Sequence, residues 1–230
     1  MTFSKHNDVE AVMIKAARDL EAIENEYQKS LNAQTVPDSL LVEVKDCLGN
    51  LRSALDYLWC KIPGAGKNAH FPVANSLDDF ANKTPNIDAK YVVAIEEWQP
   101  YTDNPWLGHF NLLRNKHAHL TLVPQKRVET KEFSVKGKDA SVTMRGTTFQ
   151  GSPGASVIIN VGGTDVPINM DTGFPADVPG VDIKRTIWID FLFDGSSISS
   201  DFPTDISVLP FLRDSLYRVA EIIEKVELIM

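Results

Sequence analysis

Hydrophobic residues recur at three- and four-residue spacings over the first half of the chain and again at its end. This spacing places them along one side of a helix. The first such stripe consists of Val9, Met13, Ala16, Leu20, Ile23, Tyr27 and Leu31. The pattern and its flanking caps and prolines predict helices over 7–33, between Asp38 and Pro63, from Pro85 to Gln99, over Asn104–Leu122 and from Asp205 to the end.

Between 123 and 193 the hydrophobic period changes to two residues, which is typical of strands. Two hairpins are predicted, one from 126–135 and 140–149 and one from 155–161 and 166–170. A last strand over 181–193 alternates Ile183, Ile187, Ile189, Phe191 and Phe193 with polar residues. We therefore expect one buried and one wet face, as in an antiparallel sheet that rests on helices.

Together these elements predict an α+β fold in a single domain over 1–230. An antiparallel helical bundle would comprise 7–122 plus 205–230, because short connections join antiparallel neighbours. A small antiparallel β-sheet over 123–194 would be inserted before the C-terminal helix.

Composition limits the partners of the protein. The net charge is −8, which argues against a broad electrostatic grip on nucleic acid or an anionic membrane but leaves room for a local basic site. No apolar run reaches eighteen residues, and the first ten residues lack the hydrophobic core of a signal peptide. Cys47 and Cys60 are thirteen residues apart on one predicted helix, too far to bridge, so we expect buried thiols in a cytoplasmic protein.

The second helix carries a polar line beside its apolar stripe. Gly49, Arg52, Asp56 and Trp59 share this line, and Arg52 and Asp56 have the i,i+4 spacing of an ion pair. Arg52 is therefore interpreted either as the structural partner of Asp56 or as a residue that binds substrate.

The most functional groups gather on the helix over Asn104–Leu122. Its second half holds Arg114, Asn115, Lys116, His117 and His119. Arginine and lysine bind phosphate, and histidine can exchange a proton near neutral pH. Any chemistry is expected on this segment.

Arg114-Asn-Lys-His-Ala-His119 resembles the Arg-x4-His motif of HEPN-type helical ribonucleases and nucleotide-binding proteins. A wider stretch, about 40–123, resembles a group of uncharacterised bacterial proteins. The second resemblance is carried by Leu51–Leu58, Phe71-Pro72, Gln99–Tyr101 and the Asn/Asp-Lys-His segment at Asn115–His117. The first resemblance implies a helical bundle that works as a homodimer on RNA or a nucleotide.

The HEPN resemblance implies metal-independent RNA cleavage without a cofactor. His119 would take the proton from the ribose 2′-OH, and Arg114 would stabilise the charge that develops on the phosphate. Asn115 would hold or orient the site. His109, His117 and His119 lack the i,i+4 spacing that places two imidazoles on one metal ion, so no metal site is predicted.

Helix geometry keeps a second interpretation open. Five residues advance about 500°, so Arg114 and His119 would lie roughly 140° apart on an unbroken helix. They converge only if the helix ends near Ala118 or a partner subunit completes the site. Arg114 with His117, and Asn115 with His119, share a face, and His117 also lies on the apolar line, as a hydrogen-bonded core histidine would.

Three functions follow from these alternatives. The first is a HEPN-like protein directed at RNA or a nucleotide, with endoribonuclease activity in one form of the hypothesis. The second is a non-catalytic binding or assembly module that meets another protein through the β insertion. The third is a small-ligand pocket between Arg52, Arg114 and His117 without chemistry. The acidic charge favours the second, and the dense basic segment favours the first or third.

Overall fold

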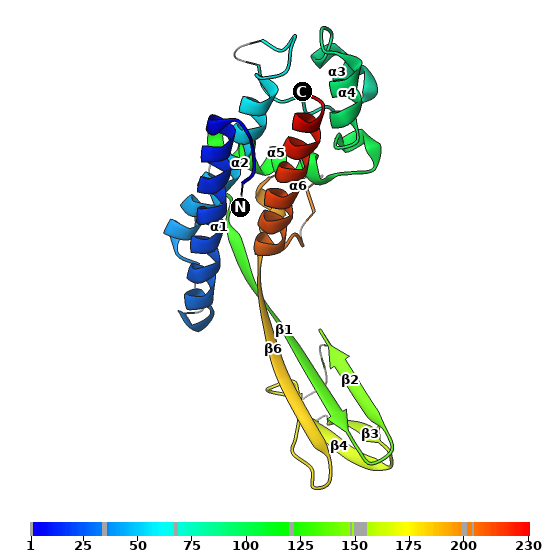
Figure 1. Cartoon of the computed structure of the whole chain (residues 1–230). Helices are drawn as coiled ribbons and strands as arrows, with labels where there is room; N and C mark the ends of the chain where they lie inside the picture. The colour runs from blue at the N-terminus through cyan, green and yellow to red at the C-terminus, as the bar shows by residue number, and fades with distance from the viewer. Residues whose placement is uncertain are drawn as a thin grey trace. The chain divides into compact units, whose positions relative to one another are not determined.

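Four long helices dominate the computed structural model of the protein (Figure 1). They are α1 (Asn7–Ala33), α2 (Asp38–Trp59), α5 (Trp106–His119) and α6 (Val208–Leu228). The structure describes residues 2–33, 36–66, 69–119, 122–147, 149, 156–198, 202–203 and 205–230, with the backbone alone at 31–33, 118–119, 188 and 197. The chain divides into two compact units, Met1–Lys126 with Phe191–Met230, and Arg127–Asp190.

The first unit is a helical bundle in which α2 packs against α1, α5 and α6. The predicted stripe of α1 is buried from Val9 to Tyr27, and the side chain of Leu31 lies outside the described residues. At the far end of α1, the ring of Tyr27 stacks on Phe191, with 4.3 Å between the ring centroids. The tyrosine hydroxyl also forms a hydrogen bond with the side chain of Gln125. The seven-residue stripe therefore predicted both the extent and the buried face of this helix.

The segment between α2 and α5 folds into two short helices, α3 (Leu77–Lys83) and α4 (Ala89–Glu96). Ser76 caps α3, because its side chain accepts a hydrogen bond from the Asp79 amide. The predicted helix start at Pro85 is wrong. Thr84 instead ends α3, its hydroxyl donating to the Phe80 carbonyl, and Asp88 caps α4.

Helix α5 is anchored to α6 by one buried hydrogen bond. The indole Nε1 of Trp106 donates to Ser215 Oγ at 2.9 Å, and Ser215 is fully buried. The helix begins at Trp106, and Asn104 accepts a hydrogen bond from Arg218. Trp106, Phe110, Leu113 and His117, which recur at spacings of four and three, are buried along one side of the helix.

The second unit consists of two antiparallel sheets, so the protein is α+β as predicted. One sheet has the order β2-β1-β6, from β1 (Gln125–Lys136), β2 (Ser141–Arg145) and β6 (Asp182–Phe193). The other has the order β3-β4-β5, from β3 (Val157–Val161), β4 (Thr164–Asn169) and β5 (Phe174–Pro175). Both predicted hairpins form. A two-residue turn, Gly162-Gly163, closes the second hairpin; both glycines have positive φ, which suits them to this turn.

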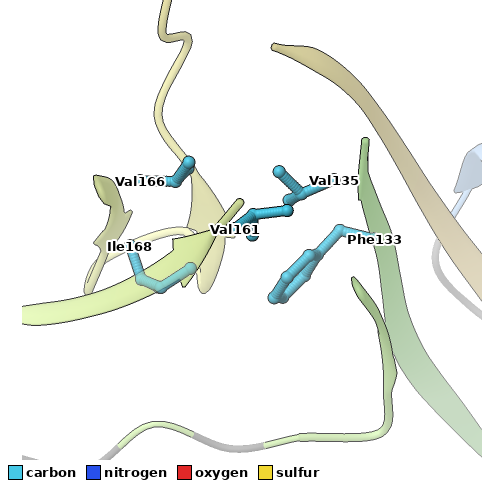
Figure 2. Close-up of a cluster of buried hydrophobic side chains, with 5 residues drawn as sticks. All are labelled: Phe133, Val135, Val161, Val166 and Ile168. Atoms are coloured by element: carbon cyan, nitrogen blue, oxygen red, sulfur yellow. The ribbon is translucent and has the colours of Figure 1, made fainter. Parts of the chain in front are cut away.

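A separate hydrophobic core lies between these two sheets. Phe133 and Val135 of β1 face Val161, Val166 and Ile168 of β3 and β4 (Figure 2). The expectation of a sheet resting on helices is therefore wrong for this cluster, whose strands bury their apolar faces against each other. Along β6 the predicted alternation holds at Phe191 and Phe193, which are buried, but Ile187 is 49% exposed.

No helix in the described ranges has the length and apolar character needed to cross a membrane.

The core of the second unit predicts different effects for the same substitution on paired strands. Ile168→Ala removes buried atoms from the core and should destabilise this unit by about 2–5 kcal/mol. Ile158→Ala, at a side chain 55% exposed, should change its stability by no more than about 0.5 kcal/mol. Amide hydrogen exchange of peptides from 127–190 measures both. Equal protection in the two variants would show that the core is misassigned.

Candidate functional site

The site is built on the polar line of α2, where Arg52 forms the predicted pair with Asp56. Their closest atoms, Nη2 and Oδ1, lie 3.1 Å apart, and the Arg52 side chain is 8% exposed. Nη2 also donates to the Phe71 carbonyl at 2.8 Å. Since a buried guanidinium is stable only with such partners, the structural interpretation of Arg52 is supported by its contacts.

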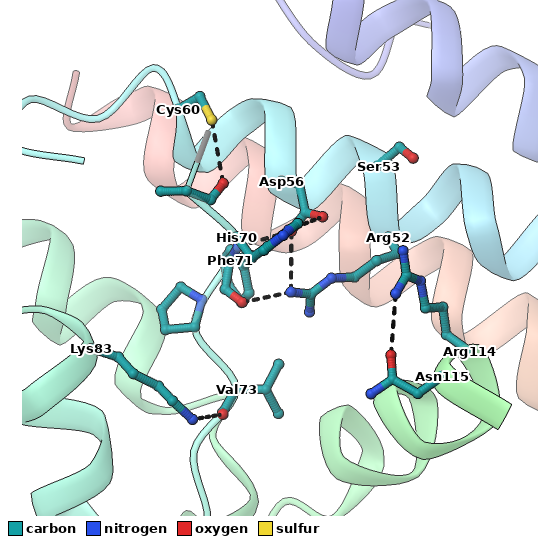
Figure 3. Close-up of polar contacts among 12 residues, drawn as sticks. Arg52, Ser53, Asp56, Cys60, His70, Phe71, Val73, Lys83, Arg114 and Asn115 are labelled. Carbon is teal, nitrogen blue, oxygen red and sulfur yellow. Dashed lines mark hydrogen bonds and ion pairs between the residues drawn. The ribbon is translucent and has the colours of Figure 1, made fainter. Parts of the chain in front are cut away.

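Asp56 connects this pair to the loop after α2. Its Oδ1 accepts the Phe71 amide at 2.8 Å, and its Oδ2 lies 3.1 Å from Nδ1 of His70 (Figure 3). The carboxylate therefore holds the chain at Phe71 against α2. Burial lowers the pKa of Arg52, Asp56 opposes that shift, and the nearby positive charge of Arg114 adds to it.

Arg114 extends from α5 toward α2. Its side chain is half-buried, and Nη1 donates to Asn115 Oδ1 at 3.2 Å (Figure 3). Within the described part of the chain, no carboxylate pairs with Arg114. Asn115 is exposed and Lys116 is half-buried. Arg114 thus keeps donors for a ligand.

His117 is a core histidine. It is 5% exposed, and its Nδ1 accepts the Val123 amide at 3.3 Å. Burial, with a smaller contribution from Lys45, lowers its pKa to about 4. The ring is therefore neutral near pH 7. It is not among the residues that line the cavity described next.

His119 is the last residue of α5, and its side chain lies outside the described residues. The α5 backbone is helical from Arg114 to His119, so the two residues lie roughly 140° apart around the helix axis, and a site that uses both needs a partner subunit. Catalysis by Arg114 and His119 therefore stays a prediction.

A cavity of about 400 Å³ lies where α1, α2 and α5 meet. Three cationic side chains line it, one from each helix: Lys15, Lys45 and Arg114. Asn50 and Ser53 add an amide and a hydroxyl, and the lining is completed by Asp46 and Gly49. A side chain added at Gly49 would meet nothing within 4 Å, so this glycine opens the floor of the cavity.

Two carboxylates partly balance these charges. Lys15 pairs with Asp19, which also accepts from Asn50 at 2.9 Å, and Lys45 lies 3.9 Å from Asp46. The cavity nevertheless keeps an excess of positive charge in a protein whose net charge is −8. We name this set of residues the basic cavity.

Arg114 stands out in the sequence because it lies in a dense basic segment, whereas no sequence pattern singles out Lys15 or Lys45. Lys15 lies off the apolar stripe of α1, and its side chain is 56% exposed, as on an ordinary solvated helix face. Only the packing of three helices that are distant in sequence reveals that the two lysines and Arg114 share one cavity.

Comparison of the chain with family models, curated proteins and solved structures finds no match. Among the described residues, no group of three or more His, Cys, Asp or Glu side chains could hold a metal ion. Cys47 is a buried thiol whose pKa is raised to about 12, mainly by burial. A thiol of this kind is a poor nucleophile near neutral pH.

Removing the charge of Asp56 should strongly destabilise the helical unit. Asp56→Asn leaves the buried Arg52 cation without a counter-charge, at a cost of about 3–5 kcal/mol. The matched control is Asp79→Asn, which breaks the exposed i,i+4 pair with Lys83 and should cost about 1 kcal/mol or less. Urea unfolding measures both. Similar losses in the two variants would contradict a special role for the buried pair.

The lowered pKa of His117 predicts a component of stability that depends on pH. Between pH 6.5 and about 4, His117 is protonated in the unfolded chain but remains neutral in the folded chain. Acid therefore lowers the free energy of unfolding. A shift of this size corresponds to about 3 kcal/mol. His117→Asn keeps an acceptor for the Val123 amide, so its unfolding free energy should fall less over this range. Parallel curves for the two proteins in urea unfolding at several pH values would count against the shift.

Proposed function

We propose that the protein binds an anion of the phosphate class in the basic cavity. The observation that supports this proposal is the convergence of Lys15, Lys45 and Arg114 from three helices on one cavity of about 400 Å³. Cationic donors around a concave site are the usual means of phosphate recognition, and charge-assisted hydrogen bonds are the strong ones. The local charge is opposite to that of the whole protein, as a dedicated anion site requires.

The polar neighbours suit a phosphate group with several oxygens. Arg114 offers a planar fork of donors, and the lysines offer point charges. Ser53 and Asn50 can donate to further oxygens, although Ser53 currently donates to the Gly49 carbonyl at 2.9 Å and Asn50 to Asp19. The expected ligand is therefore multiply charged.

The Arg-x4-His resemblance extends this proposal to a nucleotide or RNA phosphate. In that form Arg114 stabilises the phosphate, and because α5 is helical through His119, the His119 that acts on the ribose hydroxyl comes from a partner subunit. RNA cleavage in EDTA by the wild type, lost in both Arg114→Ala and His119→Ala, would support the enzyme. Phosphate binding without any cleavage would support binding alone.

Three substitutions should change phosphate binding in different directions. Arg114→Gln should weaken the affinity for inorganic phosphate roughly 10- to 100-fold, because a charge-assisted contact is lost. Asp46→Asn should strengthen it severalfold by removing a negative charge from the lining. Arg18→Gln, on the exposed side of α1, should leave it unchanged. Calorimetric titration at constant ionic strength measures all three.

An equal loss of affinity in Arg114→Gln and Arg18→Gln would mean that phosphate responds only to net charge. Absence of saturable binding in the wild type would remove the proposal.

A further inference from the structure

Arg52 has hydrogen-bonding capacity that the fold does not use. Its Nη2 serves both Phe71 and Asp56, at 2.8 and 3.1 Å. Its Nη1 is buried and has no acceptor within the described part of the chain. The whole residue is only 6% exposed. A buried donor without an acceptor costs about 1–3 kcal/mol, so such an atom calls for an explanation.

A second cavity, of about 350 Å³, lies beside this guanidinium. Three basic side chains line it: Arg52, Lys83 and His70. Trp59, Phe71 and Pro72 are apolar, and Val73 and Asn111 also line the cavity. In Figure 3, one terminal nitrogen of Arg52 has no dashed line. This nitrogen is directed toward the side on which Val73 lies. We name this set of residues the Arg52 cavity; the basic cavity is lined by other residues.

We propose that the Arg52 cavity binds a small organic monocarboxylate. One carboxylate oxygen accepts from Nη1 of Arg52, and Lys83 supplies a second positive charge. The apolar body of the ligand lies against Trp59 and Pro72. The volume suits a ligand of this size, since small-molecule pockets begin at about 300 Å³.

The charge of the ligand follows from the partners behind the cavity. Asp56 balances Arg52, and Asp79 balances Lys83 at 2.8 Å. Because both lining cations already have a carboxylate partner, the cavity accommodates a single further negative charge, whereas a phosphate dianion would be in excess.

The donor geometry of Arg52 also favours a monocarboxylate over phosphate. Nη2 of Arg52 is already occupied, so the guanidinium cannot offer the two-nitrogen fork that grips phosphate or binds a carboxylate in two places. The Nη1 group alone remains, and it fits one oxygen of a carboxylate. The apolar wall adds affinity for an organic ligand over an inorganic anion.

Benzoate and benzamide form the matched pair of probes. Both have the same ring and a carbonyl oxygen, but only benzoate carries a charge. Calorimetric titration should show saturable benzoate binding and at least about tenfold weaker benzamide binding, because the charged acceptor makes the stronger hydrogen bond. Equal affinities, or no saturable benzoate binding up to about 10 mM, would overturn the proposal.

Variants locate the binding without relying on Arg52 alone, whose loss removes the buried cation beside Asp56 and the donor to the Phe71 carbonyl. Asn111→Phe, at a half-buried position of α5, fills the cavity and should abolish benzoate binding while an unchanged circular dichroism spectrum shows an intact fold. Lys83→Gln should weaken it severalfold. The control Lys29→Gln, at a side chain 74% exposed on α1, should have no effect.

The two cavities are tested independently. Arg114→Gln should retain benzoate binding while its affinity for phosphate falls roughly 10- to 100-fold, and Asn111→Phe should lose benzoate binding while its affinity for phosphate stays unchanged. Benzoate binding that survives in Asn111→Phe, or that disappears in Arg114→Gln, would place the ligand elsewhere and refute this assignment without affecting the phosphate proposal.

Discussion

The burial of one cation determines how α2 meets the segments around it. Arg52 is 6% exposed, and a charge removed from water to this extent costs several kcal/mol unless it is paired and hydrogen-bonded. Asp56 supplies the charge and the Phe71 carbonyl a second acceptor. Because Asp56 also accepts the Phe71 amide, pairing the cation positions the loop as well. The polar line of α2 therefore fixes the loop at Phe71 against the helix.

Two cavities of different chemistry lie near this buried pair. The basic cavity collects Lys15, Lys45 and Arg114 and suits a multiply charged anion. The Arg52 cavity has apolar walls and one unused donor group, and suits an organic acid. The protein is acidic overall, so both sites depend on local placement of charge rather than on a general attraction for anions.

Local patterns predicted most of the fold, because period and caps decide where a helix or strand forms. The bounds of α1 and the Arg52–Asp56 pair follow from spacing alone. The start of α4 was missed because a Thr-Pro signal is purely local, and here Thr84 ends the preceding helix. A two-residue period shows which face of a strand is buried but not against what, so the core between the sheets could not be foreseen. The basic cavity likewise arises from packing, which brings Lys15 to Arg114.

The most direct measurement is an experimental structure of the protein soaked with tungstate, a tetrahedral oxyanion that scatters anomalously. We expect an anomalous peak in the basic cavity, placed so that the tungstate oxygens lie within hydrogen-bonding distance of Arg114 and the two lysines. A peak confined to contacts between molecules in the crystal, or an empty cavity at a tungstate concentration that phosphate titration shows to be saturating, would contradict it.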